Sequence, residues 1–394
     1  MVRHGPPPAW SSRVSASALP LKRSPLHALH LSLGARFVPF AGYELPVQYP
    51  DGLMAEHLHT RAAASLFDVS HMGQLLISGP GASSGLERLM PVDVLDLPVG
   101  KQRYGLLLNH SGGVIDDLMF LRLTAPTEGD RIFMVVNGAC KDVDLAHLRA
   151  HMDSACPIEP LADRALLALQ GPQAAAALSR LCPGVNQLVF MSGGEFSVEG
   201  MACLVTRSGY TGEDGFEISV AAHQAEALAR ALLAQPEVQP AGLGARNSLR
   251  LEAGLCLYGQ DMDTLSTPVE ASLAWAIQKV RRSGGAREGG FLGAELVLAQ
   301  LADPAALPRK RVGLVALERI PVREHTELKD ASGQRVGEVC SGLLAPSADQ
   351  PIAMAYVLPA LAAVGTRLDA MVRGKAVPME VVVMPFVAPR YYRG

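Results

Sequence analysis

Two acidic residues lie inside a strongly apolar stretch of the chain, and this pattern limits what the stretch can fold into. The segment Gly112–Asp117 reads GGVIDD and lies between the apolar runs GLLL and LMFL. Flanks of this kind predict a strand with packed neighbours. Because adjacent residues on a strand point to opposite faces, one of Asp116 and Asp117 is expected to face solvent or a cap. The other is expected to point into a cavity, where poor solvation and a neighbouring charge would raise its pKa.

An acid–base site is one interpretation of this pair. The alternative is a tight hairpin after Asn109-His110-Ser111, in which the acids only cap a turn. The segment alone leaves both open.

Length and composition narrow the class of protein. A chain of 394 residues is too long for one ordinary core and predicts two or three packed units. With 49% hydrophobic residues, 38 Gly and 28 Pro, it is typical of a turn-rich α+β protein. A formal charge of −3 offers no basic surface for nucleic acid, and no apolar run approaches the roughly 20 residues that cross a bilayer. Neither nucleic acid nor a membrane is therefore an expected partner.

The cysteines and the first residues bear on the compartment. Six cysteines occur without a Cys-x-x-Cys pair, so neither a disulfide framework nor a zinc site is expected and a reducing compartment fits. Residues 1–24 carry four basic residues and no acid, as mitochondrial transit peptides do. Pro6-Pro7-Pro8 disfavours an amphipathic helix there. We expect a flexible N-terminal extension, with a bacterial cytoplasmic location, or the mitochondrial matrix if the extension is a transit peptide.

The order of predicted elements divides the rest of the chain. Mixed helices and strands over 25–290 predict two interleaved subdomains, of which one is inserted at about 72–155. Beyond Pro308 all signals are short strands, so 300–394 is expected to form a small antiparallel barrel or sandwich. The predicted strands of this region are Arg311–Leu317, Gln334–Val339, Ile352–Val357, Arg367–Val372 and Met379–Val383.

Two further segments contain charged residues suited to ligand binding. The loop GYTGEDGFE ends in Glu217; its glycines permit close approach of a flat ligand, and a carboxylate suits the paired N–H donors of an amino-pyrimidine. A plain hairpin turn is the alternative. Arg246 and Arg250 are four residues apart on a predicted helix and share a face. One of them could clamp a ligand carboxylate, and the alternative is a structural ion pair.

Several motifs in a fixed order together closely resemble the aminomethyltransferase family, the T-proteins of the glycine cleavage system. The resemblance covers residues 25–392. It rests on FAG (Phe40–Gly42), LPVQY (Leu45–Tyr49), LFDVSHM (Leu66–Met72), GGVIDD, ALQGP (Ala168–Pro172), GYTGEDGFE, SLRLEAG (Ser248–Gly254), LYG (Leu257–Gly259) and PFV (Pro385–Val387).

The resemblance implies a three-domain, ring-like folate-binding fold with a C-terminal antiparallel β-barrel. It also implies an activity: transfer of the one-carbon unit from the S-aminomethyl-dihydrolipoyl arm of a carrier, the H-protein, to tetrahydrofolate. Ammonia and 5,10-methylene-tetrahydrofolate are the products, and neither a metal nor a flavin is expected to take part. The protein is expected to be a monomer.

The resemblance further implies which residues form the site. The catalytic aspartate of the family matches Asp116, which would stabilise charge and relay protons beside the pterin. Glu217 would hold the pterin edge, and Arg246 and Tyr391 would complete the folate site. Tyr210 and Met72 are the other expected folate contacts.

One residue departs from the pattern of the family, and two alternative functions are considered for a chain with these motifs. The family usually has Asp after the helix arginine, whereas this chain has Asn247, so a neutral hydrogen bond would replace a charge in orienting Arg246. A tetrahydrofolate-dependent demethylase could carry the same motifs. A non-enzymatic folate-binding protein of iron–sulfur maintenance would carry a Cys in the loop where this chain has Arg207–Glu213.

Overall fold

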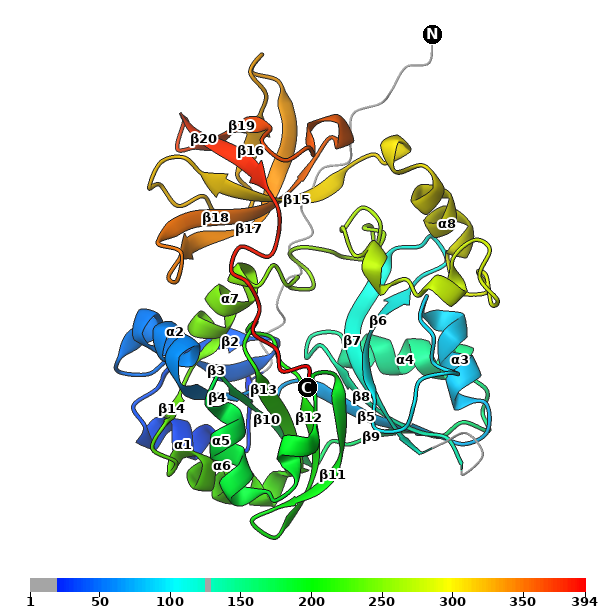
Figure 1. Cartoon of the computed structure of the whole chain (residues 1–394), viewed down its shortest axis with the longest axis vertical. Coiled ribbons are helices and arrows are strands. Elements are labelled where there is room, and N and C mark those ends of the chain that lie inside the picture. Colours follow the sequence, from blue (N-terminus) through cyan, green and yellow to red (C-terminus); the bar gives the residue numbers. More distant parts are fainter. Residues whose placement is uncertain (1–19, 125–128) are drawn as a thin grey trace.

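Three units surround a common centre in the computed structural model, which describes residues 20–124 and 129–394. Two units are built on open sheets and the third is a closed barrel (Figure 1). The expected α+β class, ring-like arrangement and C-terminal antiparallel barrel are confirmed. Within the described residues, no helix is both long and apolar enough to cross a membrane.

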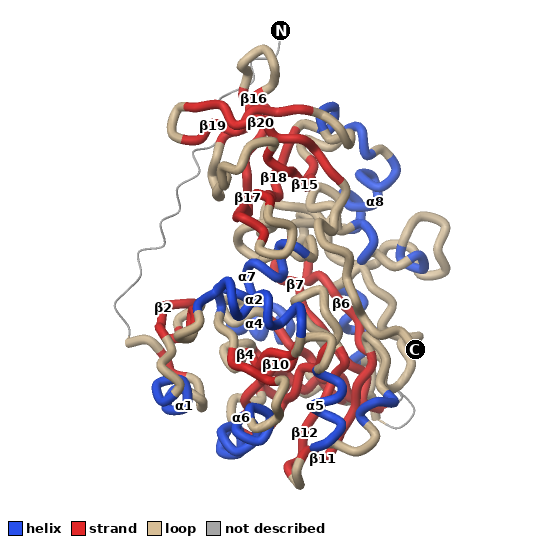
Figure 2. Tube along the Cα trace, turned by 60° about the vertical axis from the view of Figure 1, so that its left-hand side comes forward, coloured by secondary structure: helices blue, strands red, loops and turns tan. Residues whose placement is uncertain are grey.

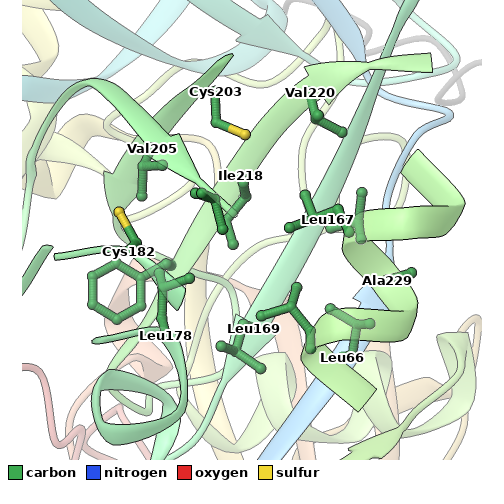
Figure 3. Packing of buried hydrophobic residues seen from close by; sticks show 14 of the residues in the cluster. Leu66, Leu167, Leu169, Leu178, Cys182, Cys203, Val205, Ile218, Val220 and Ala229 are labelled. Atoms are coloured by element: carbon green, nitrogen blue, oxygen red, sulfur yellow. The ribbon is translucent and has the colours of Figure 1, made fainter. Parts of the chain in front are cut away.

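The first unit contains a six-stranded sheet in the order β11-β12-β13-β10-β4-β14. Helices α5 and α6 cover one face, where alternate residues of β10 join the largest apolar core (Figure 3). The other face packs against α7 and the second unit. The elements are β4 (Ala64–Asp68), β10 (Arg164–Gln170), β11 (Ser192–Val198), β12 (Met201–Arg207), β13 (Gly215–Ala221), β14 (Val238–Pro240), α2 (Gly52–Ala62), α5 (Ala174–Leu181), α6 (Ala225–Leu233) and α7 (Leu243–Glu252).

A small sheet, β1-β3-β2, precedes this unit and corrects one boundary. We expected residues 1–24 to be a flexible extension. Residues 1–19 lie outside the described residues, but Lys22–Arg23 forms β1 and pairs in parallel with Tyr43–Glu44. The ordered chain therefore begins before Pro25. The other elements here are α1 (His27–Ser32), β2 (Arg36–Phe40) and β3 (Tyr43–Gln48).

The second unit is the insertion, and it contains the sheet β6-β7-β8-β5-β9. Helices α3 and α4 cover one face, and the segment 255–307, which includes α8, packs on the other. The insertion extends to residue 160, because β9 pairs with β5. The elements are β5 (Gly73–Ser78), β6 (Gln102–Leu108), β7 (Val114–Thr124), β8 (Arg131–Val136), β9 (Ile158–Pro160), α3 (Ala82–Leu89), α4 (Lys141–His151) and α8 (Ala294–Ala302).

The barrel closes in the order β15-β18-β17-β16-β19-β20. The five predicted strands are present, and the three-residue β16 was missed because so short a strand has no readable alternation. The expected boundary 300–394 is too wide at both ends. α8 packs on the second unit, and Phe190 of the first unit donates to the Tyr392 carbonyl at 2.7 Å. The strands are β15 (Lys310–Ala316), β16 (Glu327–Lys329), β17 (Arg335–Ala345), β18 (Gln350–Val357), β19 (Arg367–Val372) and β20 (Lys375–Val382).

Helix α7 joins the units. It lies between the barrel and the first sheet in both views (Figures 1 and 2). Its Ala245 and Leu249 pack among residues of the first and second sheets, while Leu251 packs against the barrel strands β17 and β18. Side chains on α7 are therefore held rigidly at the place where the three units meet.

Candidate active site

The hairpin that precedes the two acids is capped by an asparagine. Asn109 accepts hydrogen bonds from the backbone N–H of Ser111 and of Gly113 at its side-chain oxygen, both at 2.9 Å. Gly112 adopts a φ of 75°, which glycine reaches without strain. The hairpin alternative was thus right about the turn and wrong about the role of the acids, which lie beyond it in β7.

A β-bulge decides which way each acid points. Leu107 pairs with Asp116 and Leu108 pairs with Val114, so Ile115 has no partner in β6. Bulges of this kind re-aim the side chains that follow. Ile115 belongs to the core beneath α3 and α4, and Val114 to the core on the opposite face. Asp116 consequently stays on the helix-covered face with Ile115, and Asp117 returns to the face of Val114.

Asp116 is fully buried next to the start of α4. Its carboxylate accepts the backbone N–H and the side-chain amide of Asn137, each at 2.9 Å. Burial raises the pKa of Asp116, and hydrogen bonds from Asp144, Asn137 and Cys140 oppose the rise. These donors occupy the Asp116 carboxylate on the side of the strand that α4 covers, so the structure does not favour the expected place of Asp116 beside the pterin.

Asp117 lies on the side of the strand that faces the centre. Tyr104 donates its hydroxyl hydrogen to Asp117 at 3.0 Å, and the Asn137 amide donates at 2.8 Å. Burial and the charge of Asp116 raise the pKa of Asp117 to about 7. The charge of Asp117 in turn raises the pKa of Tyr210, after the larger effect of burial. Asp117 and Tyr210 are thus within electrostatic reach of each other.

Tyr210, Arg246 and Glu217 form one group. The Arg246 guanidinium lies 4.6 Å from the centre of the Tyr210 ring, and the Tyr210 hydroxyl donates to the Cys256 carbonyl. Burial lowers the pKa of Arg246 and raises that of Glu217, and the attraction between their charges opposes both shifts. Among the described residues they form no ion pair closer than 4 Å, and Nη1 of Arg246 is buried without a hydrogen-bond partner.

Met72 and its neighbour His71 border this group. Met72 packs with Ala245 and Leu249 of α7. Burial and the charge of Arg246 lower the pKa of His71 to about 3, so its ring is neutral. The His71 Nδ1 atom is buried, again without a partner in the described part of the chain. The structure therefore brings Tyr210, Glu217 and Arg246 together, and Met72 borders them through its chain neighbour His71.

Tyr391 does not join them. Its ring stacks on Phe190 with centroids 4.0 Å apart, and the charges that act on it are those of Arg61, Arg393 and Glu213. Within residues 20–124 and 129–394, no recorded contact joins Tyr391 to Arg246. That the two residues complete one site remains a prediction.

Arg250 and Asn247 have a structural role. Arg250 pairs with the buried Asp261 at 2.5 Å. This is the structural ion pair that the sequence suggested as the alternative role for one of the two arginines. Asn247 accepts from Nε of Arg250 at 2.9 Å. The departure at position 247 consequently affects Arg250, and the expectation that it orients Arg246 is wrong.

The chemistry of these groups limits what can bind here. Glu217 is an acceptor and Arg246 Nη1 is a donor, and Tyr210 adds a flat apolar surface. This set fits a flat amino-pyrimidine ring that carries a negative charge at a distance from it. No group of three or more His, Cys, Asp or Glu in the described residues is arranged to hold a metal ion.

Sequence reasoning missed four residues of this arrangement: Tyr104, Asn137, His71 and, as the acid that faces the centre, Asp117. Asn137 is a polar residue that directly follows an apolar strand, which was an available signal; Tyr104 follows Gln102 and Arg103 in its strand and does not stand out. Their convergence on Asp117 requires the pairing of three strands, which no local pattern contains.

Comparison with known proteins agrees with this architecture. The GCVT N-terminal domain matches residues 26–281, and the glycine cleavage T-protein C-terminal barrel domain matches residues 309–388. The mitochondrial aminomethyltransferase of Dictyostelium discoideum is 42% identical over 97% of this chain and 96% of its own. That of Pisum sativum is 43% identical over 98% and 94%.

A solved structure gives the same result. The glycine cleavage system aminomethyltransferase T of Bartonella henselae is 44% identical and superposes with a TM-score of 0.88, covering 95% of this chain and 100% of the other. The chain belongs to the aminomethyltransferase family, the T-proteins of the glycine cleavage system.

Proposed function

We propose that this protein transfers the aminomethyl carbon from the dihydrolipoyl arm of an H-protein to tetrahydrofolate. Ammonia leaves, and 5,10-methylene-tetrahydrofolate and the dihydrolipoyl carrier are formed. Family membership supports this reaction class. The observation that carries the assignment of residues is an acid with a pKa of about 7, Asp117, within electrostatic reach of Tyr210, the residue on which Arg246 stacks.

Asp117 is the proposed catalytic acid, in place of Asp116. Bond formation at N5 of the folate makes that nitrogen positive, and the departing ammonia needs a proton. An ionised Asp117 stabilises the positive charge, and a pKa near neutrality suits it to accept and return a proton. Tyr104 and Asn137 hold the carboxylate in one orientation.

Glu217 and Arg246 are the proposed binding residues. Glu217 has two oxygens for the paired N–H donors of the pterin, and its attraction to Arg246 opposes the rise in its pKa that burial causes. Arg246 offers its free Nη1 to a folate oxygen. Tyr210 and Met72 supply apolar contact on either side of this polar pair.

The test is ammonia release from aminomethylated H-protein with and without tetrahydrofolate, in the wild type and in Asp117→Asn. We expect the wild-type kcat to rise with pH through about 7, because the ionised form of Asp117 acts. Asp117→Asn should lower kcat by about 10²-fold or more and leave folate binding nearly unchanged. Normal turnover in this variant would refute the role of Asp117, and methyl release from another substrate would instead support a demethylase.

The compartment and oligomeric state are further proposals. We infer a monomer in the bacterial cytoplasm, or in the mitochondrial matrix if residues 1–24 are a transit peptide. The relatives from D. discoideum and P. sativum are named mitochondrial, and the B. henselae structure is from a bacterium. N-terminal sequencing of native protein and light scattering would test the two proposals separately.

A further inference from the structure

A third carboxyl group lies behind the two acids of β7. Asp144, in the first turn of α4, is 0% exposed. Neither of its oxygens receives a hydrogen bond from a donor among the described residues. Its one carboxyl neighbour in hydrogen-bonding contact is Asp116. An ionised carboxylate can only accept hydrogen bonds, so two ionised carboxylates in contact and away from water would leave both uncompensated.

The surroundings decide which of the two holds a proton. Asp116 receives hydrogen bonds from the backbone N–H and side-chain amide of Asn137 and from the Cys140 thiol, which stabilise its charge. Asp144 has no comparable donors. Burial, and then the charge of Asp116, raise the pKa of Asp144 to about 10. The proton therefore resides on Asp144 and points at Asp116.

We infer that Asp144 is a positioning residue for the transfer reaction: it keeps a proton at neutral pH and donates it to Asp116, which fixes Asn137 and, through Asn137, the catalytic Asp117. The inference rests on the proposed function, because it gives Asp117 the reactive role. The two links that involve Asn137 are short. Asn137 uses one amide group to contact Asp116 at 2.9 Å and Asp117 at 2.8 Å.

The protonated state of Asp144 also limits the charge around Asp117. With Asp144 neutral, Asp116 remains as the carboxylate charge behind Asp117. The other titratable groups around the cluster are Cys140 of α4, Tyr258 and Cys256 of the segment that follows α7, Tyr104 of β6, and Tyr210; each has a raised pKa and is neutral near pH 7. Ionisation of Asp144 would remove a donor from Asp116 and add a charge that raises the pKa of Asp117.

Three variants of the full-length protein distinguish the effect of the proton on Asp144 from the effect of its hydrogen bond to Asp116. Asp144→Asn keeps a hydrogen-bond donor but has no proton to lose. Asp144→Leu removes the donor. Asp142→Asn, on an exposed residue of the same helical turn, is the matched control. Circular dichroism and urea unfolding establish that each variant is folded.

The first measurement is independent of activity. Infrared difference spectra at a pH between 7 and 10 should show the carbonyl band of a buried protonated carboxylic acid in the wild type and in Asp142→Asn. The band should be absent from Asp144→Asn. An unchanged band in Asp144→Asn would overturn the inference even if Asp144→Leu fails to fold.

The second measurement is the pH profile of kcat with aminomethylated H-protein and tetrahydrofolate. The wild type should lose activity as the pH passes about 10, where Asp144 ionises, and Asp144→Asn should lose less. Asp144→Leu should have a kcat at least about tenfold lower at neutral pH, with folate affinity unchanged, because Asp116 then takes the proton and releases Asn137. Identical profiles in wild type and Asp144→Asn would refute the positioning role. Absence of transfer by the wild type would refute the proposed function instead, while the infrared result would still stand.

Discussion

At the scale of single residues, two arginines on one helix face have different roles. The guanidinium of Arg250 has partners within the protein: it pairs with Asp261 and also donates to Ser341 at 2.9 Å. Arg246, one turn earlier, stacks on Tyr210 and keeps a buried Nη1 without a partner in the part of the chain that the structure describes. An unpartnered buried donor costs free energy, which a ligand acceptor would recover.

The same substitution to Lys is expected to affect ligand binding at Arg246 and stability at Arg250. Arg246→Lys should weaken tetrahydrofolate binding by about 10- to 100-fold, because one charge-assisted hydrogen bond is lost, with little change in the urea midpoint. Arg250→Lys loses the guanidinium that donates at once to Asp261, Asn247 and Ser341 and should lower the free energy of unfolding by about 3 kcal/mol. Fluorescence titration with folate and urea unfolding measure the two effects. Equal loss of stability in both variants would contradict the distinction.

At the scale of elements, the hairpin and its bulge aim the acids. Gly112 turns the chain, and Gly113 allows contact with the segment that follows α7: a Cβ at Gly113 would lie 1.9 Å from the Thr264 carbonyl oxygen. Val114 then donates its N–H to the carbonyls of Asp263 and Ser266 at 3.2 and 3.0 Å. The strand that carries the acids is thus attached to the segment that carries Cys256, whose carbonyl holds Tyr210.

Substitution of Gly113 should therefore affect both stability and the site. Gly113→Ala should lower the free energy of unfolding by about 1–3 kcal/mol, because backbone must move to admit the methyl group, and should lower kcat. Gly194→Ala is the matched control in β11, where the nearest atom to the new Cβ is 3.7 Å away on the Phe196 ring. Urea unfolding and kcat of both variants test this. A Gly113→Ala protein as stable and active as the control would show that the close contact is unimportant.

At the scale of the whole molecule, a buried ion cluster joins the first unit to the barrel. Glu252, at the end of α7, accepts from Arg61 at 2.8 Å and from His57 at 3.1 Å, both on α2. It also accepts the backbone N–H of Ser347, in the loop between two barrel strands, at 2.8 Å. Although burial alone would raise it, these contacts hold the pKa of Glu252 at about 2.

Loss of this carboxylate should loosen the barrel from the rest of the protein. Glu252→Gln should lower the free energy of unfolding by about 3 kcal/mol, since Arg61 and His57 are left partly uncompensated. Glu226→Gln, which breaks an exposed pair with Arg230, should cost about 0.5 kcal/mol or less.

The contribution of Glu252 to the free energy of unfolding should decrease as the pH falls. The folded-state pKa of Glu252 is depressed, so its contribution is fully present above about pH 4.5 and is lost as the pH falls towards 2. Acid titration of the wild type and of both variants, followed by circular dichroism, measures it. An acid transition unchanged in Glu252→Gln would contradict this role of the cluster.

Local pattern was sufficient for most of the elements. Alternation and turn residues located the barrel strands and the helix that carries Arg246 and Arg250. Local pattern is less informative where one element directly follows another. Apolar and polar residues keep a helical spacing from Leu53 to Ser65, but α2 ends at Ala62, because Ala64–Asp68 is a fully buried strand of the first sheet. Residues suited to either state are assigned by the neighbours that cover them.

The sequence by itself determined the fold class, the family and the barrel, because each is encoded in residues close together or in motifs of fixed order. Only the tertiary structure decided between Asp116 and Asp117. Simple alternation from Val114 would put Asp116 on the central face, and one unpaired residue, Ile115, reverses the assignment. A bulge is defined by the partner strand, so the direction of a side chain that follows it cannot be obtained from the strand's own residues.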